Sequence, residues 1–392
     1  MSYRIIYIFF LVSAVVFGSV YLGPISLRQM FSLIMLILCL KETKNFWMDK
    51  SFKFFLLFSF FCGLTSLLYG YESDFLKMFI AYYIVAWIAL WSTFITCKNG
   101  NTMDCIHTLV CIGFFDAVIT IMQSFGNPIA LGVGMMFAPE EVEKMSASIF
   151  QGDLINSAIM GIFGAVYNGY FLMLSSILSL IYIMKYKHVV RFVPFFICFL
   201  ASFLCQQRSP FFINVLFLVF FLFKYIRHLS FSHKMILLVL SVLVFIYLFP
   251  MFVDYSNQND MRYSSVGIDG TGREDIYKHA IKYIESNLFL ANIFDFRNRF
   301  GYSPHMLFYN MIIYGGLGGF VCVVVALSIH IKASIIAIFK PLCVENLISF
   351  FSAGALLAFT ANSFTHNASI VSGDMVIWTL WAVLFASLKK SF

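Results

Sequence analysis

The chain contains few charged residues. Asp, Glu, Lys and Arg make up 11% of its 392 residues, whereas an ordinary soluble domain contains about a quarter of them. Hydrophobic residues make up 61%. This composition excludes an ordinary soluble globular domain and indicates a polytopic membrane protein.

Several motifs of known chemistry are also missing. The nine cysteines lie in or beside apolar segments and form neither a disulfide framework nor a C-x-x-C pattern. The sequence has no G-x-x-x-x-G-K-[ST], no H-E-x-x-H and no acidic pair with metal-ligand spacing, so we expect no metal and no cofactor. The net charge of +7 comes from Lys and Arg scattered between apolar runs, and does not indicate a nucleic-acid partner.

Long apolar runs are abundant. A scan for runs of about 20 residues predicts twelve membrane spans, the second and seventh of them short. Their centres lie near residues 13, 34, 61, 86, 114, 168, 198, 217, 243, 318, 355 and 380. The first run has no A-x-A cleavage site and is interpreted as an uncleaved helix. We therefore expect an all-α polytopic protein with a single integral membrane domain over residues 1–392.

The loop charges predict the orientation of the spans. With a cytoplasmic N-terminus, sixteen of the 26 Lys and Arg residues lie on the cytoplasmic side, and four lie on the outer side apart from the long loop. Both termini are thus predicted to be cytoplasmic. The loop over residues 254–304, between the ninth and tenth spans, is predicted to be outside.

One arginine interrupts an apolar stretch. Arg208 lies in FLCQQRSPFF, within a run from Phe192 to Phe223 that is too long for one helix. Proline disfavours helix at the residue before it, so QQRSP is predicted to break the run into a helical hairpin. Arg208 is then expected at the outer tip of the hairpin, at the membrane interface.

The long loop contains a helical pattern. In TGREDIYKHAIKYIES, Thr271 and Glu274 have the spacing of a capping box, and an apolar face follows, formed by Ile276, Ala280, Tyr283 and Ile284. A short amphipathic helix on the membrane surface is expected here.

The start of the tenth span carries a histidine. In FGYSPHMLFYN, Ser303 is predicted as the N-cap and Pro304 as the first helical residue, with His305 in the first turn.

Three residues are thereby predicted to meet on the outer face: Arg208, Arg273 and His305. Helix N-termini accompany Arg273 and His305, and arginine suits phosphate because its planar fork donates two parallel hydrogen bonds. We interpret the three as a candidate pyrophosphate site. Each also has a structural interpretation, namely an arginine at the lipid headgroups, a solvated loop arginine and a helix-start histidine.

Other polar residues are weaker candidates. Asp116 is an intramembrane acid, which indicates either a functional group or a hydrogen bond to a neighbouring helix. His366 is predicted to be external and to join the site. Three loop arginines are candidates for contacts with phosphate or glycan, although such residues are usually only solvated: Arg262, Arg297 and Arg299. The GGLGG sequence at 315–319 is interpreted as permitting close helix packing.

The arrangement resembles the bacterial O-antigen polymerase and O-antigen ligase superfamily. The resemblance covers most of the chain as topology and depends on three segments: CQQRSPFFINVL, GTGREDIYKHAIKYIESNLF and SPHMLFYNMIIYGGLGG. Members have an arginine beginning the span two before the large periplasmic loop, an arginine in that loop ahead of a helix, and a histidine opening the next span. These positions correspond to Arg208, Arg273 and His305.

The resemblance implies a metal-independent, GT-C-like glycosyltransferase in the bacterial inner membrane. Its substrates would be glycans linked to undecaprenyl pyrophosphate, and a chain-length regulator protein is a further expected partner. A polymerase transfers the growing glycan onto an incoming lipid-linked repeat unit, whereas a ligase transfers it onto lipid A core. Polymerase is the favoured interpretation and ligase the near alternative. A lipid-linked oligosaccharide flippase is more distant, because no internal repeat is found.

Overall fold

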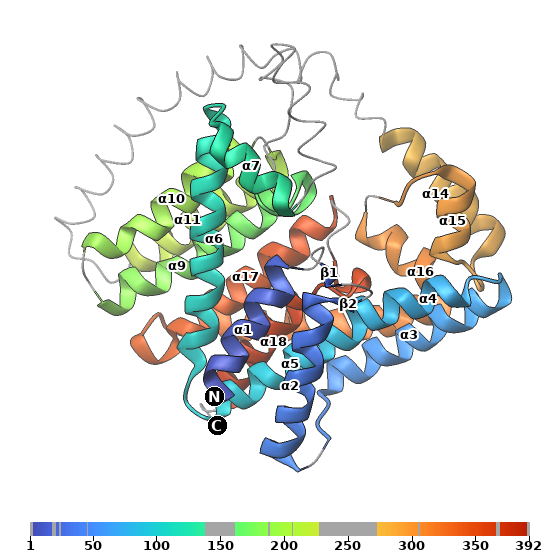
Figure 1. Cartoon of the computed structure of the whole chain (residues 1–392), viewed down its shortest axis with the longest axis horizontal. Helices are drawn as coiled ribbons and strands as arrows, with labels where there is room; N and C mark the ends of the chain where they lie inside the picture. Colours follow the sequence, from blue (N-terminus) through green and yellow to red (C-terminus); the bar gives the residue numbers. More distant parts are fainter. Residues whose placement is uncertain are drawn as a thin grey trace.

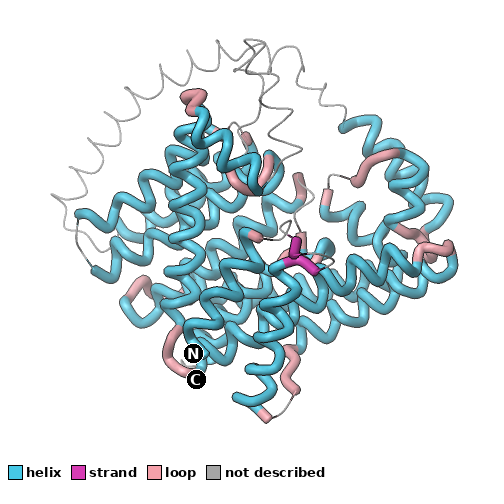
Figure 2. The backbone as a smooth tube through the Cα atoms, in the orientation of Figure 1, coloured by secondary structure: helices cyan, strands magenta, loops and turns pink. Residues whose placement is uncertain are grey.

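The computed structural model describes residues 3–17, 21–22, 25–44, 46–137, 161–186, 189–205, 207–226, 273–304, 306–365 and 369–389. Within these ranges the chain is almost wholly helical (Figure 1), and the strands that Figure 2 shows are two short ones that pair antiparallel. These strands are β1 (Tyr21–Leu22) and β2 (Ile25–Ser26). The predicted all-α class is confirmed.

The first half of the described chain consists of helices and the two short strands. The helices are α1 (Tyr3–Val16), α2 (Leu27–Thr43), α3 (Lys50–Leu68), α4 (Glu72–Met78), the π-helix η1 (Phe79–Tyr83), α5 (Ile84–Lys98), α6 (Thr102–Ser124) and α7 (Pro128–Phe137). Of these, α4, η1 and α5 form one continuous helical span.

The described part of the second half is also helical. Its helices are α9 (Ala165–Tyr186), η2 (Val189–Arg191), α10 (Phe192–Leu204), α11 (Arg208–Ile226), α14 (Arg273–Asn287), α15 (Ile293–Phe300), α16 (Leu307–Phe339), η3 (Val344–Asn346), α17 (Leu347–Ser363), η4 (Ile370–Ser372) and α18 (Met375–Lys389).

Six of the described helical segments are long and apolar enough to cross a membrane. They are Lys50–Leu68, Glu72–Lys98, Thr102–Ser124, Tyr167–Tyr186, Leu307–Phe339 and Val344–Ser363. Of the predicted span centres, the one near residue 243 lies outside the described residues, and each of the others falls within a helix. The structure is thus that of a helical membrane protein, whereas the full count of twelve spans stays a prediction.

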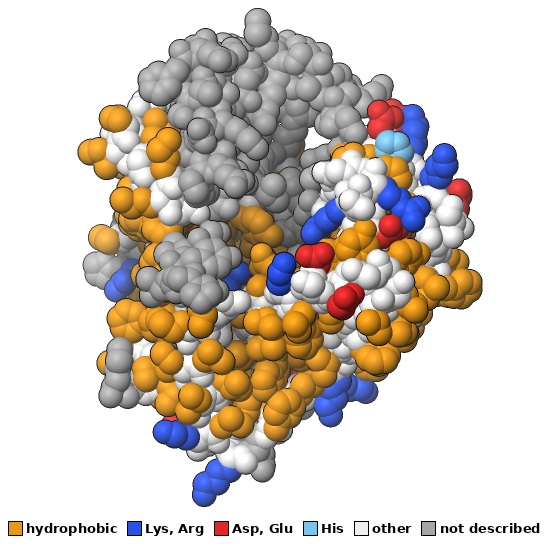
Figure 3. Space-filling view, turned by 45° about the vertical axis from the view of Figure 1, so that its right-hand side comes forward, with side chains coloured by type: hydrophobic (Ala, Val, Ile, Leu, Met, Phe, Trp, Pro, Cys, Tyr) orange, Lys and Arg blue, Asp and Glu red, His pale blue; other side chains and the backbone are white. Residues whose placement is uncertain are grey.

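Both ends of the described chain lie at the same end of the helical bundle (Figure 1), which we call the N/C end, and the opposite end is the far end. At the N/C end, Arg4 of α1 pairs with Asp104 of α6, with 2.7 Å between Nη2 and Oδ1. The space-filling view shows a broad hydrophobic belt with charged side chains on both sides of it (Figure 3). This distribution suits a bundle whose middle lies in lipid.

Helices α3 and α16 pack closely because glycines lie between them. A Cβ on Gly318 would lie 2.6 Å from a ring carbon of Phe61, and one on Gly319 would lie 3.1 Å from the ring of Phe58. In a membrane, such small residues let helix backbones approach where the hydrophobic effect between helices is weak. The predicted packing role of the 315–319 sequence is confirmed.

The same glycines kink α16. Gly315 and Gly316 have non-helical backbone angles, and Gly316 adopts a φ of +61°. The link between α14 and α15 lies at this kink, where the backbone N–H of Leu317 donates a hydrogen bond of 2.9 Å to the carbonyl of Leu288. The α14–α15 segment (residues 273–300) is thereby fastened to a long membrane helix.

Candidate functional site at the far end

Arg208 begins α11 at the tip of the predicted hairpin. Helix α10 ends at Leu204 and α11 starts at Arg208, so the predicted break is confirmed. The next residue, Ser209, contacts the end of α17 through hydroxyl and amide groups, at 2.8 Å from Asn362 Oδ1 and 2.6 Å from Thr365 Oγ1. The start of α11 therefore lies beside the end of α17, which leads directly to position 366.

Arg273 begins α14, as the sequence pattern predicts. The expected apolar face is largely confirmed, because Ala280 and Tyr283 are buried. This face packs on α15, where the rings of Tyr283 and Phe296 are 5.3 Å apart. Protein covers Ala280 and Tyr283 on this face, and the position of the helix on the membrane surface stays a prediction.

The start of α16 differs from the expected one. The helix begins at Leu307 and its N-cap position is Met306, so Ser303 is not the N-cap and residue 305 precedes the first turn. The hydroxyl of Ser303 instead accepts a hydrogen bond of 2.6 Å from Nε of Arg297. A contact with α15 thus replaces the predicted local cap.

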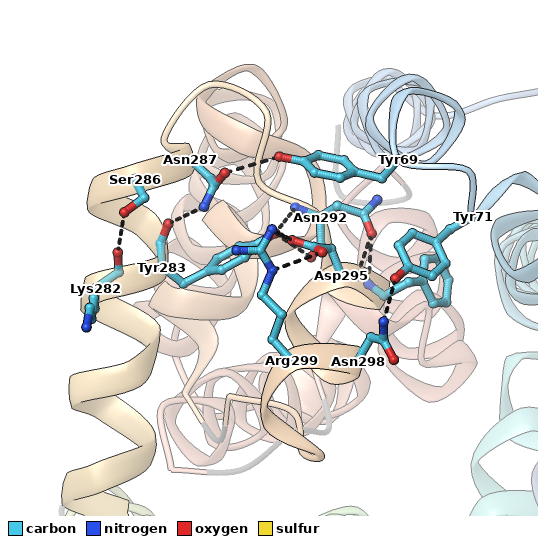
Figure 4. Close-up of polar contacts among 11 residues, drawn as sticks. Tyr69, Tyr71, Lys282, Tyr283, Ser286, Asn287, Asn292, Asp295, Asn298 and Arg299 are labelled. Atoms are coloured by element: carbon cyan, nitrogen blue, oxygen red, sulfur yellow. Dashed lines mark hydrogen bonds and ion pairs between the residues drawn. The ribbon is translucent and has the colours of Figure 1, made fainter.

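The α14–α15 segment is also held by the turn between α3 and α4 (Figure 4). Tyr69 donates a hydrogen bond of 3.1 Å to Asn287, and Nδ2 of Asn298 donates one of 3.1 Å to the hydroxyl of Tyr71. These hydrogen bonds fix the α14–α15 segment to the rest of the helical bundle at the far end.

Arg299 has a structural partner in the same view (Figure 4). Its Nε donates a hydrogen bond of 3.0 Å to Asp295 Oδ1, and its Nη2 lies 3.0 Å from Oδ2, which also accepts a hydrogen bond from Tyr283. This pairing raises the pKa of Arg299. As a cation in the last turn of α15, Arg299 also compensates the helix dipole.

Arg297 points to α16 instead. Besides the bond to Ser303, it donates a hydrogen bond of 3.3 Å from Nη2 to the hydroxyl of Tyr314, the residue directly before the kink of α16. Arg297 therefore lies beside the chain that leads to residue 305.

The remaining predicted residues lie outside the described part of the chain: Arg262, His305 and His366. Of Arg208 and Arg273 only the backbone is described. The structure places both at helix starts, and the meeting of Arg208, Arg273 and His305 in one site stays a prediction.

Sequence reasoning missed an arginine at the far end. Arg28 lies in the first turn of α2, whose N-cap Ser26 forms a capping box with Gln29. Its guanidinium lies over the ring of Tyr82 in η1, with 5.7 Å between Cζ and the ring centroid. The buried Nε has no hydrogen-bond partner, and Arg28 forms no ion pair with any residue that the structure describes.

Asp374 connects α9 and α18 to the surroundings of Arg28. The hydroxyl of Tyr170 in α9 donates a hydrogen bond of 2.8 Å to Asp374 Oδ2, and the N–H of Val376 donates one of 2.9 Å to Oδ1. A Cβ on Gly373 would lie 3.0 Å from Cβ of Tyr82, so η1 touches the turn that precedes α18. We call the following set the Arg28 cluster: Arg28, Tyr82, Tyr167, Tyr170 and Asp374.

Electrostatics connects the members of the Arg28 cluster. Tyr82, Tyr167 and Asp374 lie close enough to Arg28 to act on its charge. Burial raises the pKa of Asp374, although the hydrogen bonds from Tyr170 and from the backbone oppose that shift. One signal in the sequence pointed here, because an arginine in the first turn of a helix opposes the helix dipole.

Asp116 has the structural role that the sequence left open. It is fully buried in α6, and its Oδ1 accepts a hydrogen bond of 2.9 Å from the N–H of Ile162. Gln123, two turns further on, accepts a hydrogen bond of 2.9 Å from the N–H of Gly161. These contacts hold the turn that leads into α9, so hydrogen bonding to a neighbouring segment accounts for Oδ1 of Asp116, while Oδ2 is buried without a hydrogen-bond partner among the described residues.

Among the described residues, no three His, Cys, Asp or Glu side chains are grouped so as to hold a metal ion. Comparison of the chain with protein-family models, with curated proteins and with solved structures gives no match.

Proposed function

We propose that the chain is an O-antigen polymerase of the bacterial inner membrane. It transfers a growing glycan from undecaprenyl pyrophosphate onto an incoming lipid-linked repeat unit at the periplasmic face. The far end of the bundle is then periplasmic, and both termini are cytoplasmic. The full fold would be a GT-C-like bundle of about twelve spans.

The main support is that helices begin at both arginines of the resemblance. Helix α11 starts at Arg208 and α14 starts at Arg273, the positions where the polymerase and ligase superfamily has its arginines. Helix N-termini carry unpaired N–H groups and a partial positive charge, which suit a pyrophosphate. The firm attachment of α14–α15 to α3, α4 and α16 is what a fixed phosphate site requires.

The proposed chemistry is a displacement at the anomeric carbon of the donor glycan. An acceptor hydroxyl oxygen forms the new bond while the bond to the pyrophosphate oxygen breaks, and undecaprenyl pyrophosphate leaves with the electron pair. Arg208 and Arg273 stabilise the charge that develops on this leaving group. His305 either binds the same phosphates or accepts the proton of the hydroxyl.

A gene deletion tests the function. Without a polymerase, surface lipopolysaccharide should carry a single repeat unit on its core, because the ligase still acts on unpolymerised donor. Complementation with Arg208→Ala, Arg273→Ala or His305→Ala at normal protein level should give the same gel profile. Arg→Lys variants should restore little glycan transfer, because lysine cannot form the bidentate hydrogen bonds that arginine donates to phosphate.

Other gel profiles would refute the assignment. Bare core with accumulated lipid-linked polymer identifies a ligase instead, and an unchanged surface glycan contradicts both and favours a flippase for another substrate. Full activity of an Arg→Ala variant removes that arginine from the site.

A further inference from the structure

The Arg28 guanidinium forms no ion pair with any described residue, and its buried Nε has no hydrogen-bond partner. The negative charge that reaches it comes from Asp374, without a direct bond. A buried cation is stabilised best by a hydrogen-bonded anion, and the cation–π contact with Tyr82 is a weaker substitute. The guanidinium therefore lacks a bonded anion.

Asp374 does not supply that anion. Both of its oxygens accept hydrogen bonds, one from Tyr170 and one from the backbone of Val376, where the carboxyl caps α18. No ion pair joins it to Arg28 among the described residues, and burial disfavours its charged form. Arg28 remains available to a ligand.

The surroundings of Arg28 suit a phosphate group. The guanidinium lies in the first turn of α2, a helix of seventeen residues whose N-terminal N–H groups and dipole favour an anion. A planar fork of donors matches phosphate oxygens. Tyr82 and Tyr167 are 44% and 39% exposed, so part of the Arg28 cluster lies at the protein surface.

Exposed apolar side chains on or directly before the elements that carry Arg28 and Tyr82 suit a lipid tail. Leu76 and Ile80 are 55% and 42% exposed on the stretch that leads to Tyr82, and Ile25 is 45% exposed just before α2. A ligand that fits both surfaces has an anionic head and a hydrocarbon chain. A π-helical turn at η1, rare in proteins, is frequent at functional sites.

We propose that the Arg28 cluster binds the phosphate of a membrane-embedded lipid. If the proposed function holds, the Arg28 cluster takes one of the two lipid-linked substrates that polymerisation requires. Arg28 then binds the phosphate, and the tyrosines line the space next to it. The site itself does not depend on that function.

Native mass spectrometry of the purified full chain tests this with undecaprenyl phosphate as the probe. Wild type should bind two copies, and Arg28→Ala should bind the second copy about tenfold more weakly, as expected for the loss of a charge-assisted hydrogen bond. Arg28→Lys should keep part of this binding. Lys77→Ala, which removes an exposed lysine of the same face, should bind like wild type.

The same measurement separates the two sites. Arg208→Ala should lose one copy and the double variant with Arg28→Ala should lose both, so a failure at Arg208 alone refutes the pyrophosphate site and leaves the Arg28 site intact. Equal binding by wild type and Arg28→Ala overturns the present proposal.

Two other probes identify the source of the phosphate. Loss of phosphatidylglycerol binding in Arg28→Ala would assign the site to phospholipid headgroups. Binding of inorganic pyrophosphate without either lipid would refute a lipid ligand. A melting temperature of ligand-free Arg28→Ala several degrees below wild type would also contradict the proposal, because it would make Arg28 a structural residue.

Discussion

Asn292 shows how one side chain can hold a segment in place. It is fully buried, and its Oδ1 accepts hydrogen bonds from the N–H groups of Phe294 and Asp295, which caps α15. Its Nδ2 donates to the hydroxyls of Thr65 and Ser66 in α3, at 3.2 and 2.9 Å. The residue thus starts one helix and binds it to another.

Replacing Asn292 by Ala should detach α15 from α3. Loss of a cap costs about 1 kcal/mol and two further buried hydrogen bonds about 1 kcal/mol each, so we expect a loss of about 3 kcal/mol of stability. The control is Asn298→Ala on the same helix, which removes one exposed hydrogen bond and should cost less than about 0.5 kcal/mol. Thermal unfolding in detergent measures both, and equal melting temperatures would contradict this role of Asn292.

A second prediction at the level of residues concerns the positive charge that stabilises the pyrophosphate leaving group. The sequence lacks a carboxylate cluster of the kind that usually holds a divalent ion on a pyrophosphate, and the proposal assigns that task to arginines. Glycan transfer by the purified protein should therefore persist in EDTA. Loss of transfer on chelation, with rescue by Mg²⁺ or Mn²⁺, would show that a metal ion stabilises the leaving group.

At the level of secondary structure, the sequence predicted those helix ends and helix faces that depend on residues close together in the chain. Pro210 lies in the first turn of α11, where a proline is tolerated, and the spacing of apolar residues predicts α14 and its buried face. The start of α16 was predicted three residues too early. Ser303 and Pro304 have the local preferences of a helix start, but Ser303 binds Arg297, which belongs to another helix. Local preference cannot reveal such a contact.

A substitution at the kink of α16 tests whether the backbone contact there holds the α14–α15 segment. A side chain at Gly316 would require a φ of +61° and would place Cβ 2.1 Å from the carbonyl oxygen of Phe289. Gly316→Ala should therefore displace the α14–α15 segment and lower the melting temperature by several degrees, in the range of a loss above about 2 kcal/mol.

Gly132→Ala is the matched control for that substitution. Gly132 lies within α7 and a Cβ there meets no atom within 4 Å. Alanine is the better helix former, so stability should stay the same or rise slightly. If both variants unfold at the same temperature, the backbone contact at the kink is not what fastens the segment.

For the whole molecule, hydrophobicity was sufficient to predict the class of protein, and it was insufficient to predict the Arg28 cluster. An apolar run identifies a membrane helix because the residues of the run alone determine whether it is stable in lipid. The Arg28 cluster joins residues from α2, η1, α9 and the start of α18, which are far apart in the chain. Only the packing of the helices brings them together.

The two ends of the bundle should be separable by chemical labelling. In a variant without cysteines, Glu274→Cys at the far end should react with an impermeant maleimide in intact spheroplasts, because this side chain is exposed at the start of α14. Lys98→Cys, exposed at the end of α5, should react only after the membrane is opened. The reverse pattern would invert the proposed orientation.

The hydrogen bond between Leu317 and Leu288 has an evolutionary consequence. Both partners are main-chain groups, so the identities of the side chains at 288 and 289 are not constrained by this bond. The α14–α15 segment can therefore diverge in sequence, and change the surface it presents, while its attachment point is inherited unchanged. At this bond, selection needs to preserve only the absence of a side chain at position 316, so chimeras that exchange the segment between related proteins could be joined here if the side-chain contacts of Asn292 are kept.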